Sequence, residues 1–249
     1  DHEQLAEESG LDEAEVVDRL ETGREQLFAA RAERTRPGRD EKILAGWNGL
    51  AISALAEGSL ALDADLAERA RDALTFVRDR LWDADAGLLK RRYADGDVQT
   101  DGYLEDYAFL ARGAVDCYQA TGDPEALAFA LDLARAIETR FWEDEAGTLY
   151  MTEAGGSDLL ARPQEVTDRS TPSSTGVAVD VLLTLSSFVS HNRFEDVARS
   201  VLETHHDAIA ANPLQHASLV LAADHAATGA SELTVAADAV PAAWHERIG

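Results

Sequence analysis

The sequence predicts an all-α protein that forms a partial α/α toroid, in which antiparallel helical hairpins place one layer of helices inside and another outside. Two observations indicate this architecture. Nearly apolar segments alternate with amphipathic ones along the chain, and a motif that closes one outer helix recurs 60 residues later. Because each hairpin can bury its apolar helix only against neighbouring hairpins, this alternation favours a ring of hairpins.

The first two helices differ sharply in character. Residues 11–34 are predicted as one long charged helix with an irregular apolar stripe, ended by Thr35, Pro37 and Gly38. Residues 43–62 form a nearly all-apolar helix. A helix that is apolar on all sides is expected to be buried on all sides.

The remaining segments continue the alternation between inner and outer helices. Residues 63–81 carry apolar side chains at spacings of three and four, with charged residues on the other side, and are predicted to face water. After them, the apolar segments 103–120, 175–189 and 214–227 are predicted as inner helices, and the amphipathic segments 124–141 and 193–211 as outer helices.

The internal repeat runs from Leu81 to Gly87 and again from Phe141 to Gly147. Each copy is followed by a predicted β-hairpin. The first begins at Leu88–Tyr93 and turns at Asp95-Gly96, and the second begins at Thr148–Thr152 and turns at Gly155-Gly156. Insertions of this kind at one end of a fold usually frame a cleft.

The C-terminal end of the chain has a different pattern. Glu232–Ala236 is predicted as a short strand, and Pro241–Gly249 shows no clear pattern. We therefore divide the chain into a toroid part, residues 1–230, and a C-terminal strand and tail, residues 231–249.

The charge balance excludes several partners. The formal net charge is −25, with 47 acidic and 22 basic side chains, and Lys42 and Lys90 are the only lysines. Acidic residues spread along the whole chain indicate a solvated surface, and their excess over lysine suggests a salt-adapted protein. Nucleic acids and anionic membrane surfaces would be repelled, so we expect neither as a partner.

The chain has no run of about 18 apolar residues and no basic-then-apolar leader, so we expect a soluble, cytoplasmic protein. Its only methionine is Met151, which suggests a fragment of a longer protein. Cys117 is the sole cysteine, which excludes an intrachain disulfide, a CxxC motif and a thiolate zinc site. We expect no metal and no cofactor.

Three segments resemble a known family. Arg36–Leu50, Asp101–Phe109 and the proline–serine element Thr171–Ser174 are similar, in order and spacing, to signatures of the spermatogenesis-associated, thioredoxin-like proteins. The resemblance extends over nearly the whole chain.

The resemblance implies a fold and possible partners. In that family a thioredoxin-like domain precedes a toroid similar to the six-hairpin glycosidases and the acylglucosamine epimerases, and this chain matches only the C-terminal part, without the thioredoxin-like domain. It implies a carbohydrate-active site of the sugar hydrolase or epimerase type. The possible partners are a small saccharide, a thioredoxin-like domain or the missing half of the toroid.

The start of the inner helix at 103–120 holds the main candidate chemistry. Glu105 and Asp106 lie about 100° apart around the helix, so at least one carboxylate is expected to point into the toroid. It would serve as a general acid or base, with Tyr103 and Tyr107 stacking on a sugar ring. The alternative is that these acids only stabilise the positive helix N-terminus.

Other candidates come from the neighbouring helix starts. Asp168 would complete a pair of carboxylates with Asp106, and Ser173 would contact the substrate. The alternative is a loop acid beside an ordinary N-cap serine. Trp47 and Asn48 would supply a stacking plane and an amide at the cleft, or the tryptophan would belong to the core.

Two functional hypotheses follow from these candidates. The first is a sugar hydrolase or epimerase cleft, and it predicts a deep pocket lined by Asp106, Tyr107, Asn48 and Asp168. His216 is the only histidine considered as a base, and a core histidine is the alternative. The second is a non-catalytic toroid that binds a partner or is coupled to a thioredoxin-like domain. The second hypothesis predicts scattered carboxylates and an exposed apolar face.

Overall fold

The structure is a computed structural model, and it describes residues 1–62, 65–154, 161–189 and 192–229. Their contacts divide the chain into two compact units, residues 1–41 and residues 42–249. The predicted strand at Glu232–Ala236 and the predicted boundary at residue 230 lie outside the described residues or at their edge, and remain predictions.

The first unit is a pair of helices. α1 (His2–Ser9) begins after the N-cap Asp1, and α2 (Glu13–Ala32) begins after Asp12, whose carboxylate accepts the Glu15 backbone N–H. α2 matches the predicted charged helix closely, whereas α1 was not predicted. Val16 is the only residue of α2 that is buried.

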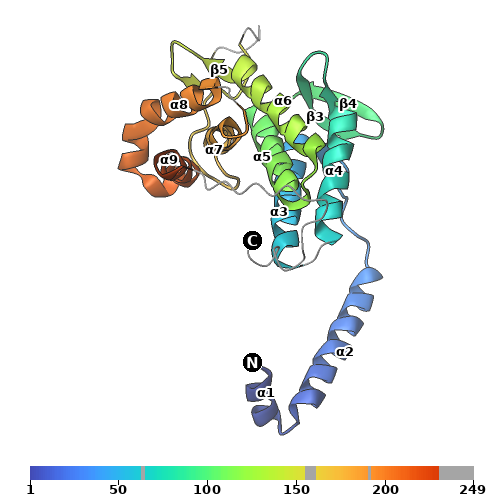
Figure 1. Cartoon of the computed structure of the whole chain (residues 1–249). Helices are drawn as coiled ribbons and strands as arrows, with labels where there is room; N and C mark the ends of the chain where they lie inside the picture. Colours follow the sequence, from blue (N-terminus) through green and yellow to red (C-terminus); the bar gives the residue numbers. More distant parts are fainter. Residues whose placement is uncertain (63–64, 155–160, 190–191, 230–249) are drawn as a thin grey trace. The chain divides into compact units, whose positions relative to one another are not determined.

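The second unit has the predicted alternation of helices (Figure 1). The inner helices are α3 (Ala45–Ala61), α5 (Leu104–Thr121), α7 (Ser174–Ser186) and α9 (Ala217–Thr228), and the outer ones are α4 (Asp65–Leu81), α6 (Pro124–Phe141) and α8 (Asn192–Ala211). Each inner helix packs on the next, and α4, α6 and α8 pack on α3, α5 and α7 respectively. The fold is therefore an α/α toroid part.

The inner helices run parallel to one another. Contacts along α3 and α5 advance together, from Gly46 against Asp106 to Gly49 against Phe109 and Leu110. The same holds for α7 and α9, where Gly176 lies against Ser218 and Asp180 binds His225 further along. Leu104 at the start of α5 and Ser174 at the start of α7 both hydrogen-bond to Met151, so the four inner helices described here begin at the same end of the unit.

Local signals explain most helix ends. Asp123 caps α6 with Pro124 in the first turn, and Gly122 ends α5 in the left-handed conformation at φ 69°. The predicted helix at 214–227 is divided into a 3₁₀ turn, η1 (Pro213–His216), and α9. Pro213 has no N–H and begins η1.

The first predicted hairpin is confirmed. β3 (Leu88–Ala94) pairs with β4 (Asp97–Asp101), and the turn residues Asp95 and Gly96 both have positive φ. β1 (Ile43–Leu44) and β2 (Trp82–Asp83) also pair with β3, so a small sheet forms beside the start of α3.

The second predicted hairpin remains a prediction, because its turn at Gly155-Gly156 lies outside the described residues. Its first segment, β6 (Thr148–Leu149), pairs with the preceding β5 (Trp142–Glu143) across a turn at residues 144–147. The repeated motif itself makes this turn, because Trp82 pairs with Leu89 as Trp142 pairs with Leu149. The motif glycines Gly87 and Gly147 both have positive φ, which explains why glycine closes each copy.

The core lies between the two helix layers. Its largest buried side chains include Tyr107, Phe109, Phe141 and Phe194, and Trp82 packs edge-on against Tyr107 and Phe129.

The expectation that α3 is buried on all sides is wrong. One side of α3 packs on α5, and the opposite side is exposed at Trp47, Ala51 and Ala54.

Candidate functional site

The longest connections in the second unit all lie at one end of the inner helices. The chain passes from α4 to α5 through residues 82–103 and from α6 to α7 through 142–173, while α5 passes to α6 through two residues, 122–123. Long connections beside a rigid scaffold are where binding residues concentrate. The N-terminal ends of the inner helices are therefore the place where a site is expected.

Glycines set the distance between α3 and α5 at this end. A Cβ at Gly46 would lie 3.1 Å from a carboxylate oxygen of Asp106, and one at Gly49 would lie 2.4 Å from the carbonyl carbon of Phe109. Gly113 faces Gly49 in the same way, with a Cβ only 2.6 Å from the Gly49 oxygen. These close contacts, the glycine seam, place the first turn of α3, with Trp47 and Asn48, at the level of the first turn of α5.

Asp106 joins the two helices. Its carboxylate accepts the backbone N–H of Gly46 at 3.1 Å and of Tyr103 at 3.0 Å, and the Arg91 guanidinium lies at 2.7 Å. The side chain is almost fully buried. Burial raises the pKa of Asp106 above its ordinary value, although the Arg91 charge and the two backbone donors oppose this shift.

Glu105 is the more accessible carboxylate. It lies 2.5 Å from Arg91, and 22% of its side chain is exposed. Arg91 also lies over the Tyr103 ring, with the guanidinium carbon 5.0 Å from the ring centre. Tyr103 is 38% exposed, so an aromatic face is open beside the Glu105–Arg91 pair, and Trp47 in the first turn of α3 is 65% exposed.

Arg91 was missed as a site residue because it belongs to β3 and not to a helix start. The signal available was the basic run Lys90-Arg91-Arg92 in a chain of net charge −25. Opposite charges within about 4–6 Å favour each other's ionised form. A short basic run in the hairpin before an acidic helix start therefore indicated a partner for Glu105 or Asp106.

Two of the predicted binding residues are used within the protein. The Tyr107 side chain is buried, and its hydroxyl accepts the backbone N–H of Leu89 at 2.7 Å, which ties β3 to α5. Asn48 donates its side-chain amide to the Leu44 carbonyl at 2.8 Å. Both residues support the frame of the site in this structure.

Asp168 makes the corresponding joint between α7 and α9. It accepts the backbone N–H of Ser173 at 2.8 Å and of Ser218 at 3.0 Å, and also the Ser218 hydroxyl. Burial acts to raise the pKa of Asp168, but these donors outweigh it and hold the pKa below its ordinary value. No hydrogen bond or ion pair joins Asp168 to Asp106 within the described part of the chain.

Ser173 is the N-cap of α7 and is fully buried. Its hydroxyl donates to the Glu165 carbonyl at 2.8 Å and accepts the Gly176 N–H at 3.1 Å. Predicted as a substrate contact, it is engaged in this structure as a helix cap, the alternative that the sequence left open.

The histidine predicted as a base has a structural partner. Nδ1 of His216 lies 2.9 Å from the Asn212 carbonyl oxygen, and the side chain is buried. A different histidine, His225, lies 2.8 Å from Asp180. Sequence analysis did not select it.

His225 ends a polar ladder that crosses all four inner helices, made of Ser53, Asp116, Arg112, Asp180 and His225. Arg112 binds Asp116 at 3.0 Å and also binds Asp180, while Ser53 donates to Asp116. Burial raises the pKa of Asp116 despite the nearby Arg112 charge. The sequence feature that could have predicted this ladder is the presence of charged residues within otherwise apolar inner helices.

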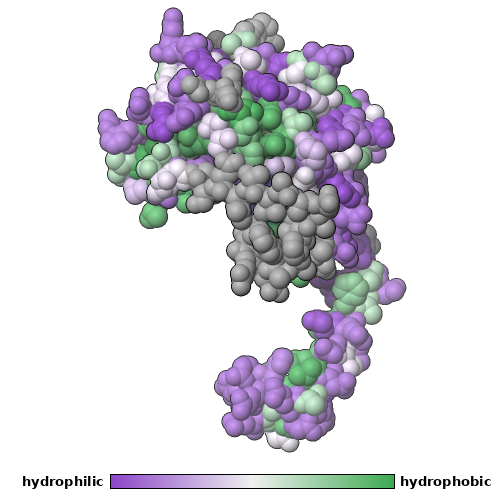
Figure 2. All heavy atoms as spheres, in the orientation of Figure 1, coloured by the Kyte–Doolittle hydropathy of each residue, from purple (hydrophilic) through white to green (hydrophobic). Residues whose placement is uncertain are grey.

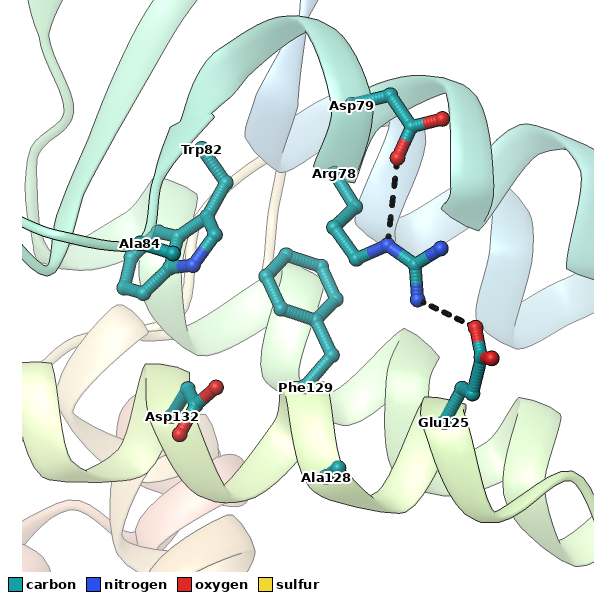
Figure 3. Close-up of a pocket in the computed structure, with 8 residues that line it drawn as sticks. All are labelled: Arg78, Asp79, Trp82, Ala84, Glu125, Ala128, Phe129 and Asp132. Atoms are coloured by element: carbon teal, nitrogen blue, oxygen red, sulfur yellow. Dashed lines mark hydrogen bonds and ion pairs between the residues drawn. The ribbon is translucent and has the colours of Figure 1, made fainter.

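A hollow of about 410 Å³ lies elsewhere, on the outer layer between α4 and α6 (Figure 3). Trp82 and Phe129 line it with ring centres 5.7 Å apart, and Arg78 spans it to reach Glu125 at 3.0 Å. None of the predicted site residues lines this hollow. It is therefore separate from the helix ends described above.

Within the described residues, no three His, Cys, Asp or Glu side chains come together as possible metal ligands. Over the same residues, no helix has both the length and the apolar character needed to cross a membrane.

Solved structures share this fold. Cellobiose 2-epimerase from Spirochaeta thermophila is similar with a TM-score of 0.56 and 19% identity, over 70% of this chain and 46% of that one. A GH76 α-mannanase of Bacteroides thetaiotaomicron is similar with a TM-score of 0.54 and 14% identity, over 76% of this chain and 53% of that one. D-mannose isomerase is similar with a TM-score of 0.53 and 14% identity, over 68% of this chain and 46% of that one. The chain is thus part of an α/α toroid of the class seen in glycosidases and sugar epimerases.

Sequence comparison identifies the particular family. No family model matches the chain. Spermatogenesis-associated protein 20 of Mus musculus is 36% identical over 197 residues, and the Homo sapiens protein is 34% identical over the same length. These matches include 75% of this chain and 25% of each relative, so the chain spans about a quarter of their length. The chain is a homologue of spermatogenesis-associated protein 20, as its three sequence signatures predicted.

Proposed function

We propose that the second unit carries a saccharide site of the carbohydrate-active type at the N-terminal ends of α3 and α5. The observation that carries the proposal is the exposed Tyr103 ring beside Arg91 and the partly exposed Glu105, with the exposed Trp47 in the first turn of α3 at the same level. Aromatic faces stack on sugar rings, and polar groups around them bind hydroxyls. The sugar-processing proteins that share the fold support the same class of ligand.

Within this site the residues have different roles. Glu105 is the proton-transfer candidate because it is the more open carboxylate, while Asp106 holds α3, α5 and Arg91 together. Asn48 and Tyr107 support the frame, and Asp168 is a second carboxylate at the neighbouring pair of helix ends.

The consecutive acids Glu105 and Asp106 have a parallel in one structure with the same fold. An α-1,6-mannanase of Salegentibacter was inactive when two consecutive aspartates were replaced by asparagine; the similarity has a TM-score of 0.51 and 14% identity. This parallel supports the acid pair as the chemical centre. Hydrolysis of a glycosidic bond requires two carboxyl groups, whereas epimerisation requires groups that remove and return a proton.

The charge of the chain favours a neutral sugar. With a net charge of −25, the protein repels uronic acids and phosphorylated sugars before they reach the site. Neutral mannose- or glucose-type saccharides of the kind processed by the similar structures are the first ligands to test.

A saccharide panel measured by thermal unfolding at high salt tests the site. A sugar at about 100 times its dissociation constant stabilises the native state by about 2.7 kcal/mol, which raises Tm by roughly 5–10 °C. We expect this shift in the parent chain, and its loss in Trp47→Ala and in Glu105→Gln.

The matched control is Leu60→Ala, which removes an exposed apolar side chain from the other end of α3. It should keep the full shift. If no sugar shifts Tm in a well-folded sample, or if Trp47→Ala keeps the full shift, the site is not at these helix ends.

The second candidate function is a partner-binding toroid without catalysis. One observation favours it, namely that α3 exposes apolar side chains on the face opposite α5.

A further inference from the structure

The internal repeat allows the hollow beside Trp82 to be compared with the equivalent place beside Trp142. Each tryptophan directly follows an outer helix, α4 or α6, and the two lie 60 residues apart. In the second copy the chain itself fills this place. The Arg193 guanidinium of α8 lies over the Trp142 ring, with its carbon 5.9 Å from the ring centre. A cation over a tryptophan face is a favourable contact.

Two carboxylates complete the surroundings of Arg193. Its guanidinium lies 2.7 Å from Asp144 and 3.4 Å from Glu138. Asp144 also accepts the indole N–H of Trp142 at 2.8 Å, so the ring and the cation share one acceptor. The second copy of the motif is therefore a small guanidinium site, built from one aromatic face and two carboxylates.

The first copy has the same frame without the cation. The ion pair between successive outer helices is present there, but its charges are exchanged. Arg78 stands at the position of Glu138, 60 residues earlier, and binds Glu125. Glu125 is the second residue of α6, as Arg193 is of α8. Within the described part of the chain, no cation lies over the Trp82 ring.

The edge of the indole ring differs in the same way. Ala84 stands where Asp144 accepts the indole N–H in the second copy, and the Trp82 N–H has no acceptor among the described residues. In Figure 3 the indole nitrogen lies on the side of the Trp82 ring that faces Phe129. The hollow of about 410 Å³ between them falls in the lower part of the range typical of ligand pockets, about 300–1,000 Å³.

The lining of the hollow favours a positive charge. Three carboxylates line it, those of Asp79, Glu125 and Asp132, against one basic side chain, Arg78. Arg78 pairs with the first two, whereas Asp132 pairs with Arg135, which lies outside the lining. Hydrophilic residues also cover most of the face seen in Figure 2, and the net charge of −25 attracts cations over a longer range.

We propose that the hollow between α4 and α6 binds an arginine side chain of a partner protein, which takes the place that Arg193 has in the second copy. Its guanidinium would lie against Trp82 and bind Asp132. The cation comes from a partner because the next outer helix, α6, presents Glu125 here. Both walls of the hollow are described and lie within the row of outer helices, so the hollow does not arise from a hairpin that the row lacks.

The indole N–H signals in NMR spectra of the tryptophan-labelled chain test the proposal, because each tryptophan gives one signal. The probes are two short peptides that differ in one residue, arginine or citrulline, whose side chain is planar but uncharged. We expect the arginine peptide to move the Trp82 signal and to leave those of Trp47 and Trp142 in place. The citrulline peptide should bind about ten-fold more weakly. Trp82→Phe assigns the Trp82 signal.

Ala84→Arg should close the site from within the chain. Ala84 is an exposed residue of the lining, so the new guanidinium is placed beside Trp82 and competes with the peptide. We expect this variant to bind the arginine peptide at least about ten-fold more weakly than the parent chain, with unchanged helicity. Ala208→Arg is the matched control, because Ala208 is exposed in α8, does not line the hollow and receives the same charge. It should bind the peptide nearly as the parent does.

Three results would overturn the proposal. One is equal affinity for the arginine and citrulline peptides. Another is a Trp82 signal that the arginine peptide leaves in place, including the case in which a neutral sugar moves it. The third is equal weakening by Ala84→Arg and Ala208→Arg, which would assign the binding to net charge alone. The saccharide site proposed above is tested at Trp47 and Glu105, so its outcome is separate from this one.

Discussion

Replacement of Gly49 by alanine is expected to lower the free energy of unfolding by about 3 kcal/mol or more. The new Cβ would lie 2.4 Å from the Phe109 carbonyl carbon and 2.5 Å from the Leu110 nitrogen. Both are backbone atoms of α5 and cannot move aside as a side chain would. The two inner helices must therefore separate, and the frame that holds Asp106 against Gly46 is lost with them.

Gly58→Ala in the same helix is the matched control. Its Cβ would lie 3.4 Å from the end of the Leu66 side chain, which is an ordinary contact. Alanine also favours a helix over glycine by up to about 1 kcal/mol, so we expect this variant to be as stable as the parent or more stable. Chemical unfolding followed by circular dichroism at fixed salt measures both variants. Equal stability of Gly49→Ala and the parent would contradict the close packing of α3 on α5.

Asp106→Ala is expected to destabilise the fold by about 2–4 kcal/mol. The substitution leaves two backbone donors, from Gly46 and Tyr103, without an acceptor at the helix ends. It also leaves Arg91 with Glu105 as its only remaining carboxylate partner in this cluster. This loss of stability is smaller than for a fully buried ion pair, because about a quarter of the Arg91 side chain is exposed to solvent.

Glu105→Ala provides the comparison within the same cluster. Glu105 contacts Arg91 but caps neither helix, so its loss is expected to cost about 1 kcal/mol or less. Unfolding curves of the two variants separate the positioning role of Asp106 from the proton-transfer role proposed for Glu105. If Asp106→Ala proved as stable as the parent, Asp106 would not be the joint between α3 and α5.

The alternation of helices was predictable because burial imposes it directly on the sequence. Inner segments such as 103–120 are apolar on nearly every side, outer segments such as 124–141 on one side, and the structure places their ends within a few residues of those bounds. The exposed side of α3 was not predictable in this way, because the pattern reports what a helix can bury and not which neighbours are present.

The site was predictable to the extent that it lies on helix starts. Tyr103, Glu105 and Asp106 belong to one helix turn, and the first turn of α3 lies at their level because Gly46 and Gly49 permit close packing. Arg91 was missed because it reaches the site from a hairpin. The ladder to His225 was missed because it joins residues up to about 170 positions apart, which no local spacing can indicate.

Sequence analysis also could not predict that a single carboxylate caps two helices. Asp106 and Asp168 each accept backbone N–H groups from two different helices, an arrangement that depends on parallel helices starting at one level. Sequence analysis weighed each acid against a single helix start. In the structure Asp106 accepts N–H groups at the starts of α3 and α5, and Asp168 does the same at the starts of α7 and α9.

Hydrogen–deuterium exchange with and without the saccharide that most raises Tm tests the central claim most directly, because it locates the bound sugar on the chain. We predict slower exchange at the start of α3, in β3 and at the start of α5, around Trp47, Arg91 and Glu105, with no change along α6. Protection centred on the hollow beside Trp82 and Phe129, or no protection at the three predicted segments, would contradict a saccharide site at the inner-helix ends.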